Sequence, residues 1–307
     1  MILTICPNPS MDCTIELDNL NVGMLNRISN KVETYSGKAL NVAMGVARLG
    51  GSVFATGFMF DNNGKMFEHT LDREHVNYKF VWNKGSVRVN YKIIDKRSML
   101  TEINDKGDEV SIDKQVELIE LVRDLSQKCD IAVMSGSLPK GVDSSFYDEV
   151  LSVIPPKVKK IVDTEKNNLE YALKHDLFMV KPNLRELEAF VGESLKTKKD
   201  ICKASLSLID RGARHVLVSL GGDGAILTDG REMFYCKSAN VAVNSTVGAG
   251  DSMVASACVQ IQKNASLEEI LRSSVAAGTA SITTSGTNLF YKDKYDEIYQ
   301  KIFVERL

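Results

Sequence analysis

A glycine-rich segment, Thr246–Asp251, directly precedes an apolar run with helical spacing. A glycine turn that opens a helix leaves the first N–H groups unpaired, and these groups together with the helix dipole attract anions. Asp251 at the mouth of such a site can accept a proton from a hydroxyl that attacks phosphorus. The segment predicts phosphoryl transfer, with Asp251 as the base and Gly248, Ala249 and Gly250 as the anion site. By itself it also fits an N-capping aspartate after a flexible loop.

Two further glycine-rich loops lie next to predicted elements: the first leads into a helix, and the second follows a strand. In Ser36–Asn41, Gly37 permits close approach of a ligand, Lys38 supplies a cation, and Asn41 lies one turn into an amphipathic helix. Ser219–Ala225 follows a strand and fits either a nucleotide contact or an ordinary turn. The sequence contains neither a P-loop nor the dinucleotide-binding Gly-x-Gly-x-x-Gly after its first strand, which disfavours both of those classes.

Composition excludes several classes of function. The 307 residues include 38 basic and 40 acidic side chains, which gives no support to binding of nucleic acid or of a membrane surface. The apolar stretches are too short for a bilayer span, and the N-terminal residues lack the pattern of a signal peptide. The six cysteines are scattered without a Cys-x-x-Cys pair, which favours free thiols in a reducing compartment. We expect a cytoplasmic protein.

Short apolar strands alternate with amphipathic helices along the chain. The predicted strands are Ile2–Cys6, Ser52–Met59, Ile131–Met134, Lys160–Asp163, Phe178–Val180 and His215–Leu220. The predicted helices are Lys38–Leu49, Lys114–Leu125, Phe146–Val153, Leu184–Phe190 and Lys199–Asp210. This alternation predicts a mainly parallel sheet that binds its ligand at the carboxyl ends of the strands.

One region departs from this alternation. Tyr78–Trp82, Val87–Ile94 and Met99–Ile103 are predicted as successive strands separated by turns. With Cys13–Leu17 and Arg27–Thr34 they predict a small antiparallel sheet, contributed by about residues 12–34 and 78–104. Such a sheet fits a substrate lid or a dimer surface, and also a plain extension of the sheet edge. The chain shows no internal repeat or linker, so a single domain over 1–307 is expected.

A cationic strand face lies within this region. Arg88, Asn90 and Lys92 alternate along one predicted strand and therefore face the same side. Two cations and an amide on one face fit a sugar phosphate, because arginine can hold phosphate oxygens bidentately. A solvated strand face is the alternative.

Taken in order, these motifs resemble the ribokinase-like (PfkB-type) sugar kinases over the whole chain. The segments that carry the resemblance are Asn8–Asp12, Ser36–Asn41, Ser135–Gly141, Lys181–Leu187 and Thr246–Ser252. The chain is most similar to the phosphosugar branch, which contains the 1-phosphofructokinases and tagatose-6-phosphate kinases. Arg88–Ile93 and Thr101–Asn104 favour the former. The resemblance implies a ribokinase-like three-layer α/β sandwich with a mainly parallel central sheet and a small antiparallel β lid.

The activity that the resemblance implies is ATP-dependent phosphorylation of a phosphosugar, first of all fructose 1-phosphate to fructose 1,6-bisphosphate. Tagatose 6-phosphate, or an unphosphorylated sugar or nucleoside, are the alternative acceptors. A non-catalytic binding protein on the same fold is a further alternative. The implied partners are ATP, Mg²⁺ and the sugar, with a possible homodimer through the lid.

The resemblance also assigns residues to the two substrates. On the sugar side it implies Asp12, Arg27, Gly37, Lys38, Asn41, Arg88, Asn90 and Lys92. On the ATP side it implies Lys181, Asn183, Ser219, Gly221, Gly222, Gly224, Thr246, Gly248, Gly250, Ala277, Gly278 and Ser281. For the metal it implies Asn183 and Glu186, which would act through water because Mg²⁺ dehydrates reluctantly.

Four residues depart from the family pattern. Ala39 stands where glycine usually follows the lysine, and Ser36 replaces a glycine or alanine before Gly37. A methyl group at Ala39 is expected to narrow the sugar pocket or shift the loop. Glu165 and Lys166 form a bulkier, charged pair than the family pattern has, and are expected to alter contacts near the nucleotide. None of these departures is at Asp251 or in the predicted anion site.

Overall fold

The computed structural model describes residues 1–97, 99–284 and 289–307. Within them, ten strands form one sheet in the order β14-β13-β12-β11-β10-β9-β8-β1-β4-β5. The parallel strands are β1 (Ile2–Cys6), β4 (Val53–Phe60), β5 (Asn77–Asn83), β8 (Ile131–Ser135), β9 (Lys159–Asp163), β10 (Met179–Val180) and β11 (Val216–Ser219). The antiparallel strands at one end are β12 (Ala225–Thr228), β13 (Met233–Cys236) and β14 (Val304–Arg306).

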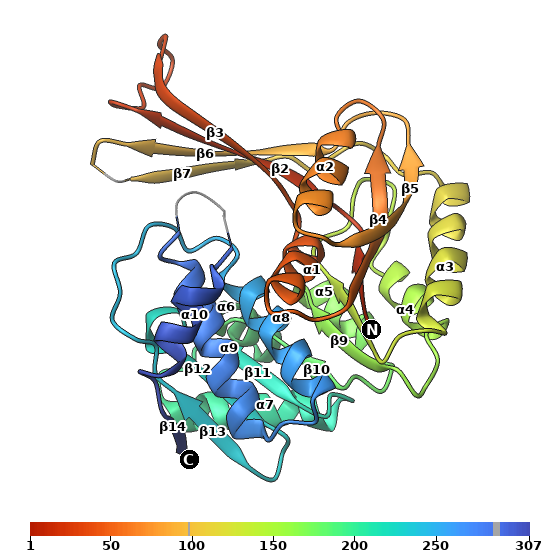
Figure 1. Cartoon of the computed structure of the whole chain (residues 1–307), viewed down its shortest axis with the longest axis vertical. Coiled ribbons are helices and arrows are strands. Elements are labelled where there is room, and N and C mark those ends of the chain that lie inside the picture. Colours follow the sequence, from red (N-terminus) through yellow and green to blue (C-terminus); the bar gives the residue numbers. More distant parts are fainter. Residues whose placement is uncertain (98, 285–288) are drawn as a thin grey trace.

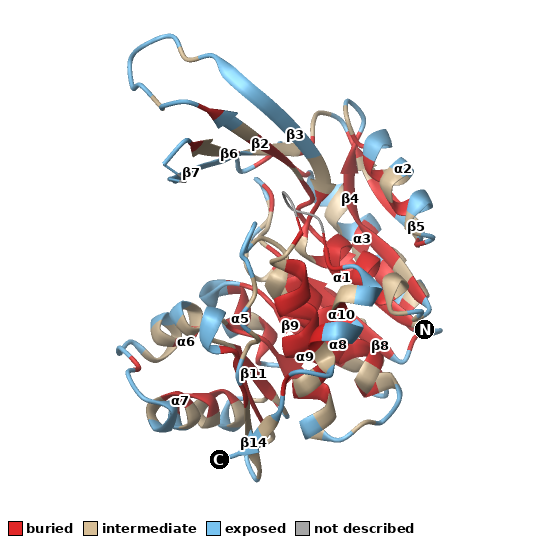
Figure 2. Ribbon diagram, turned by 60° about the vertical axis from the view of Figure 1, so that its left-hand side comes forward, coloured by how far each residue is buried: buried red, intermediate tan, exposed pale blue. Residues whose placement is uncertain are grey.

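Burial on both faces explains why the central strands are almost continuously apolar. Every residue of β1 and β8 is buried, as expected for parallel strands covered by helices on both sides. The predicted strands of the main sheet are all present, which confirms the expected α/β architecture. Figure 2 shows the buried residues concentrated in the sheet and in the helices that cover it.

The helices form two groups, one on each face of the sheet (Figure 1). The first group is α1 (Lys38–Arg48), α8 (Ala249–Gln262), α9 (Leu267–Ser281) and α10 (Lys292–Tyr299). The second is α3 (Ile112–Ser126), α4 (Phe146–Ser152), α5 (Lys166–Ala172), α6 (Leu184–Val191) and α7 (Lys198–Asp210). Helix α2 (Lys65–Arg73) contacts β5 and the lid strand β3. Among the described residues, no helix is both long and apolar enough to cross a bilayer.

A second sheet projects from one end of the main body and forms the lid (Figure 1). Its order is β3-β2-β6-β7, with β2 (Ser10–Leu17), β3 (Ile28–Ser36), β6 (Arg88–Asp95) and β7 (Leu100–Asn104). The pairs β2–β3 and β6–β7 are antiparallel, whereas β2 and β6 pair in parallel. Ser98, inside the predicted lid range, lies outside the described residues.

The assignment of Tyr78–Trp82 to the lid was wrong. These residues belong to β5, which pairs in parallel with β4 at the edge of the main sheet. Helix α2 provides the crossover between the two strands, so β4-α2-β5 is a further βαβ unit. The short connection at 84–87 then leads from the main sheet into the lid.

Candidate active site

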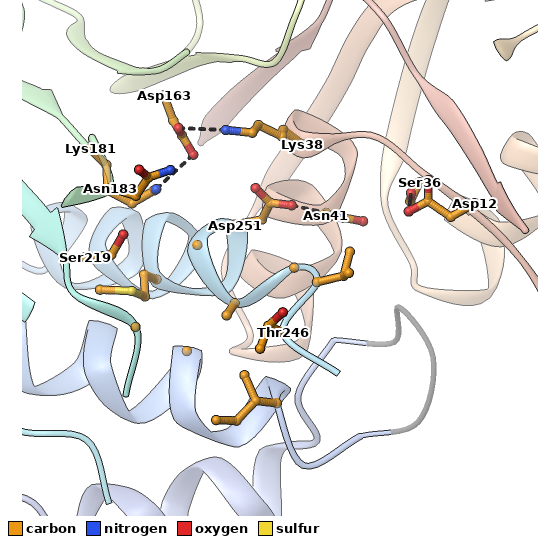
Figure 3. Close-up of a pocket in the computed structure, with 18 of the residues that line it drawn as sticks. Asp12, Ser36, Lys38, Asn41, Asp163, Lys181, Asn183, Ser219, Thr246 and Asp251 are labelled. Carbon is orange, nitrogen blue, oxygen red and sulfur yellow. Dashed lines mark hydrogen bonds and ion pairs between the residues drawn. The ribbon is translucent and has the colours of Figure 1, made fainter. Parts of the chain in front are cut away.

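A cavity of about 570 Å³ lies between the lid and the carboxyl ends of the parallel strands. It brings together most of the predicted residues: Asp12, Gly37, Lys38, Asn41, Arg88, Asn90, Lys92, Lys181, Asn183, Ser219, Gly221, Gly222, Gly224, Thr246, Gly248, Ala249, Gly250, Asp251 and Gly278. Four predicted residues are not part of its wall: Arg27, Glu186, Ala277 and Ser281. Figure 3 shows how the labelled side chains converge from the lid, α1, α8 and the strand ends.

The amino terminus of α8 forms one side of this cavity. Gly248 caps the helix with φ of +79°, a left-handed conformation that glycine adopts without strain. The N–H groups of Ala249, Gly250 and Asp251 have no partner within the helix, and all three residues line the cavity. The predicted anion site is therefore open to a ligand at the positive end of the α8 dipole.

Asp251 is buried beside these amides. Asn41 donates its Nδ2 hydrogen to Oδ2 of Asp251 over 2.8 Å, which fixes the carboxyl group against α1 (Figure 3). Burial raises the pKa of Asp251 to about 6, and the Lys38 ammonium partly offsets that effect. A carboxylate with this pKa is ionised at neutral pH yet basic enough to accept a proton from an attacking hydroxyl.

A buried carboxylate between two lysines was missed by the sequence analysis as a site residue. Asp163 ends β9 and contacts the Nζ of Lys38 at 3.0 Å and the Nζ of Lys181 at 3.2 Å (Figure 3). Burial alone would lower the pKa of Lys38, but Asp163 and Asp251 raise it above its ordinary value, so Lys38 stays charged. Lys181 also lies against the first turn of α8, 3.0 Å from the position that a Cβ on Gly250 would take. Both ammonium groups are thus held next to the anion site.

At the lid end, Asp12 is the centre of a polar cluster. Its carboxylate accepts hydrogen bonds from Lys92 Nζ at 2.8 Å and Asn90 Nδ2 at 3.1 Å. The hydroxyls of Ser10 and Ser36 approach it at 3.4 and 3.3 Å. Lys92 is therefore ion-paired with Asp12, so only one of the two cations predicted on this strand face, Arg88, has no carboxylate partner among the described contacts.

Arg88 keeps its charge available to the cavity. Among the described contacts its guanidinium donates to the carbonyl oxygens of Asn8, Pro9 and Asp105 at 3.3–3.4 Å, and to no carboxylate. Arg88, Asn90 and Lys92 all line the cavity, which confirms that the three residues share one face of β6. Glu102 lies directly opposite Lys92 on β7 and also lines the cavity. The sequence analysis assigned it no role.

Buried amide oxygens remain for a ligand. Within the described residues, Oδ1 of Asn41 and Oδ1 of Asn90 have no hydrogen-bond partner although both are buried. Such orphaned acceptors are rare in folded proteins and are typical of a site completed by a ligand. Sugar hydroxyls can donate to both atoms.

The opposite end of the cavity is less polar and is the end where the sequence analysis expects the nucleotide. The loop after β11 forms a 3₁₀ turn at Gly221–Asp223, and Ser219 pairs with Asn183 in an isolated bridge. From α9, one helical stripe lines the wall: Val275, Gly278, Thr279 and Ile282. The predicted Ala277 and Ser281 are fully buried and do not line it.

Thr279 was missed by the sequence analysis. Its Oγ1 is buried and has no hydrogen-bond partner among the described residues. The spacing of Val275, Thr279 and Ile282 contains the signal, because i, i+4 and i+7 share one face of a helix. The sequence analysis instead selected the small residues Ala277 and Ser281 on the same helix.

Asn183 and Glu186 form the capping box of α6. Asn183 Oδ1 accepts from the Glu186 N–H at 2.9 Å, and Glu186 Oε2 accepts from the Asn183 N–H at 2.8 Å. Glu186 lines a shallower cavity beside the main one, together with Glu165 and Lys166. Glu165 and Lys166, the charged pair that differs from the family pattern, therefore lie outside the main cavity.

Two other sequence features also lie outside the cavity. Arg27 is exposed in the turn at the tip of the lid, between β2 and β3. Ala39 is fully buried and does not line the cavity, so its methyl group does not narrow the pocket as expected.

Comparison with known proteins identifies the class. Residues 8–294 match the family model for pfkB family carbohydrate kinases. The chain is 30% identical to a tagatose-6-phosphate kinase of Staphylococcus epidermidis, over 99% of each chain. It is 28% identical to a 1-phosphofructokinase of Vibrio cholerae, over 100% of this chain and 97% of the relative. The fold is similar to that of phosphofructokinase-2 from Escherichia coli in complex with potassium, with a TM-score of 0.91, 32% identity and 98% of each chain covered.

The chain therefore belongs to the pfkB family of carbohydrate kinases. It is a sugar kinase with the ribokinase-like α/β fold. The cavity is lined by the first turn of α8, by the buried Asp251 carboxylate and by polar residues of the lid.

Proposed function

We propose that this kinase transfers the γ-phosphoryl group of ATP to a hydroxyl of a phosphosugar, with fructose 1-phosphate as the first candidate and fructose 1,6-bisphosphate as the product. The position of Asp251 supports the proposal. It lies in the same cavity as the α8 amides on one side and the Asp12–Asn90–Lys92 cluster on the other. A hydroxyl held by the lid can thus meet a phosphoryl group held by α8 at this carboxylate.

In the proposed reaction, Asp251 accepts the proton of the sugar hydroxyl as its oxygen forms a bond to the γ-phosphorus. The bond from that phosphorus to the bridging oxygen of ATP breaks, and ADP leaves with the electron pair. The N–H groups of Ala249 and Gly250 donate to the transferring phosphoryl oxygens, where such donors usually provide the largest stabilisation. Lys181, held against Gly250 by Asp163, adds positive charge there.

Mg²⁺ is expected to neutralise the ATP phosphates. The described residues contain no cluster of three or more carboxylate, histidine or cysteine ligands. Glu186 uses Oε2 in the capping box and is next to the main cavity rather than in it. This arrangement fits an ion that retains its waters and reaches Glu186 through them, since Mg²⁺ commonly binds one or two carboxylates and the substrate phosphates.

Tagatose 6-phosphate is the second candidate acceptor. The relative named tagatose-6-phosphate kinase is 30% identical to this chain, and a relative named 1-phosphofructokinase is 28% identical. Both sugars would place a phosphate near Arg88, whose guanidinium forms no hydrogen bond to a described carboxylate. An unphosphorylated sugar or nucleoside would leave Arg88 without an anionic partner.

The test is ADP release with purified protein, MgATP and a panel of fructose 1-phosphate, tagatose 6-phosphate, fructose 6-phosphate, fructose and ribose. We expect the highest kcat/KM for fructose 1-phosphate. Preference for tagatose 6-phosphate would select the second candidate. Turnover of only the unphosphorylated sugars would contradict a phosphosugar kinase.

We further propose a homodimer formed through the lid. Its strands, turns and tip expose large apolar side chains, a feature typical of interaction surfaces. The exposed residues are Val22, Met24, Leu25, Ile28, Val32, Tyr91, Met99, Leu100 and Ile103. The cytoplasm is the proposed location, because all six cysteines are free thiols.

A further inference from the structure

One face of helix α1 runs from the catalytic centre to the far end of the helix. Lys38, Asn41, Gly45 and Arg48 are spaced by three or four residues and so share that face. Lys38 pairs with Asp163, and Asn41 holds Asp251. Gly45 packs closely against α8. Arg48, at the end of the helix, does not line the cavity, yet it has the most extensive contacts of the four.

Arg48 joins three separate segments. Its Nη1 donates to the carbonyl oxygens of Leu289 and Phe290, each at 2.9 Å. Its Nε and Nη2 donate to the two carboxylate oxygens of Glu74 at 2.8 and 2.5 Å, a bidentate geometry. About four-fifths of both side chains is buried, since only 19% of Arg48 and 22% of Glu74 is exposed. A pair this buried and this well bonded fixes the position of Leu289 and Phe290.

Leu289 in turn contacts the anion site. Its Cδ2 lies 3.2 Å from the position of a Cβ on Gly248, the cap of α8. Leu289 and Phe290 are both buried, and the Phe290 ring also lies next to Gly45. A continuous series of contacts therefore connects Glu74, Arg48, Leu289 and Gly248.

We propose that Arg48 is a positioning residue for phosphoryl transfer, which holds Leu289 against Gly248 so that the first amides of α8 stay aligned with Asp251. Without the guanidinium, two carbonyl oxygens in a buried segment lose their donor. The segment is then free to shift, and with it the cap of α8. A displacement of about 1 Å can cost about 100-fold in rate although the displaced group is far from the reacting atoms. This inference rests on the proposed kinase reaction.

The main test compares Arg48→Met, Arg48→Lys and Glu74→Gln with wild type. We expect Arg48→Met to lower kcat about 10- to 100-fold while KM for the sugar changes less than about twofold, because the lid contacts are intact. Arg48→Lys keeps a donor for the carbonyls and should lose less. Glu74→Gln weakens only the orientation of Arg48 and should lose least.

An exposed control is available in Arg214, which forms a bidentate pair with Asp176 at the other end of the strands, with 61% and 59% of the two side chains exposed. Arg214→Met should keep wild-type kcat. Added guanidinium provides a second readout that a purely structural loss would not give. Arg48 lines a cavity of about 370 Å³, through which guanidinium can reach the space left in Arg48→Ala. Partial recovery of kcat in millimolar guanidinium is the expected result.

Binding of ADP–beryllofluoride, measured by calorimetry, separates this inference from the proposed function. Arg48→Met should bind ADP like wild type but ADP–beryllofluoride at least about tenfold more weakly, with Arg48→Lys between the two, whether or not any sugar of the panel is phosphorylated. An unchanged ADP–beryllofluoride affinity would overturn the positioning role. So would a folded Arg48→Met enzyme with kcat within twofold of wild type. An inactive wild type would instead contradict the proposed acceptor alone.

Discussion

At Asp251, the burial that suits the proposed catalytic role also lowers the stability of the folded protein. The carboxylate proposed to accept the proton is buried and has a pKa raised to about 6 from its ordinary 3.8. Asp251→Asn keeps the size of the side chain and an oxygen for the bond from Asn41. We expect kcat to fall about 10²- to 10⁴-fold while ATP still binds, because the variant lacks only the proton acceptor. Steady-state ADP release and calorimetric titration with ATP measure the two quantities.

The same variant should be more stable than wild type, and the difference should depend on pH. Folding raises the pKa of Asp251, so the ionised form opposes folding above pH 6, and this cost disappears as the pH falls through 6 towards 4. Thermal unfolding should therefore give a higher Tm for Asp251→Asn at pH 8, by about 2 °C or more, and a smaller gain at pH 5. Near-wild-type turnover, or a stability gain that grows on acidification, would contradict this account.

At the scale of elements, the close packing of α1 on α8 carries the geometry of the site. A Cβ at Gly45 would lie 2.7 Å from the Cβ of Ala255. Gly45→Ala would normally favour a helix by about 1 kcal/mol. Here we expect overpacking to cost about 1–3 kcal/mol and to lower both Tm and kcat, because Asn41 and Asp251 would be separated.

The compensating change tests the cause. Ala255→Gly removes the obstructing methyl group, so the double variant Gly45→Ala/Ala255→Gly should recover wild-type Tm and kcat. Differential scanning calorimetry and ADP release on the three variants would decide. A higher Tm for Gly45→Ala alone would show that the helices separate without cost.

The sequence patterns predicted where strands and helices occur better than which strands pair with one another. The apolar runs of β1 and β8 identify buried strands directly, because every residue in them is buried. The strand at Tyr78–Trp82 was recognised but paired wrongly, since a short turn follows it and suggests a hairpin. Its true partner, β4, lies across the α2 crossover. The periodicity of a strand does not encode which neighbour it pairs with.

The candidate site was predictable to a similar extent. Glycine-rich loops and the Asp251 segment are local signals, and the structure brings them into one cavity. Asp163 and Arg48 depend on contacts with residues 125 and 241 positions away in sequence, respectively. Nothing adjacent to either residue distinguishes it from an ordinary strand end or a surface cation. Such roles arise only from the fold.

At the scale of the whole molecule, the lid is the surface where a second copy is expected to bind. Leu25 at its tip and Leu100 on its edge strand β7 are 75% and 52% exposed. We expect sedimentation velocity at micromolar concentration to show a dimer for wild type and a monomer for Leu25→Glu/Leu100→Glu, because charges at these positions oppose apolar contact. Phe303→Glu is the matched control, since Phe303 is 77% exposed but lies near the C-terminus, outside the lid. A monomeric wild type would contradict the proposal.

The separation of the two sheets has a consequence for how acceptor choice can evolve. Asp12, Arg88 and Asn90 belong to strands of the lid, whereas Asp251 and the anion site belong to a helix packed on the main sheet. If the lid binds the acceptor as proposed, substitutions on the lid face should change what is recognised without disturbing the core that the remaining helices and strands share. Inherited variation can therefore accumulate in recognition while the reaction itself is preserved. Directed evolution of a new acceptor would begin most productively with libraries confined to β2, β6 and β7.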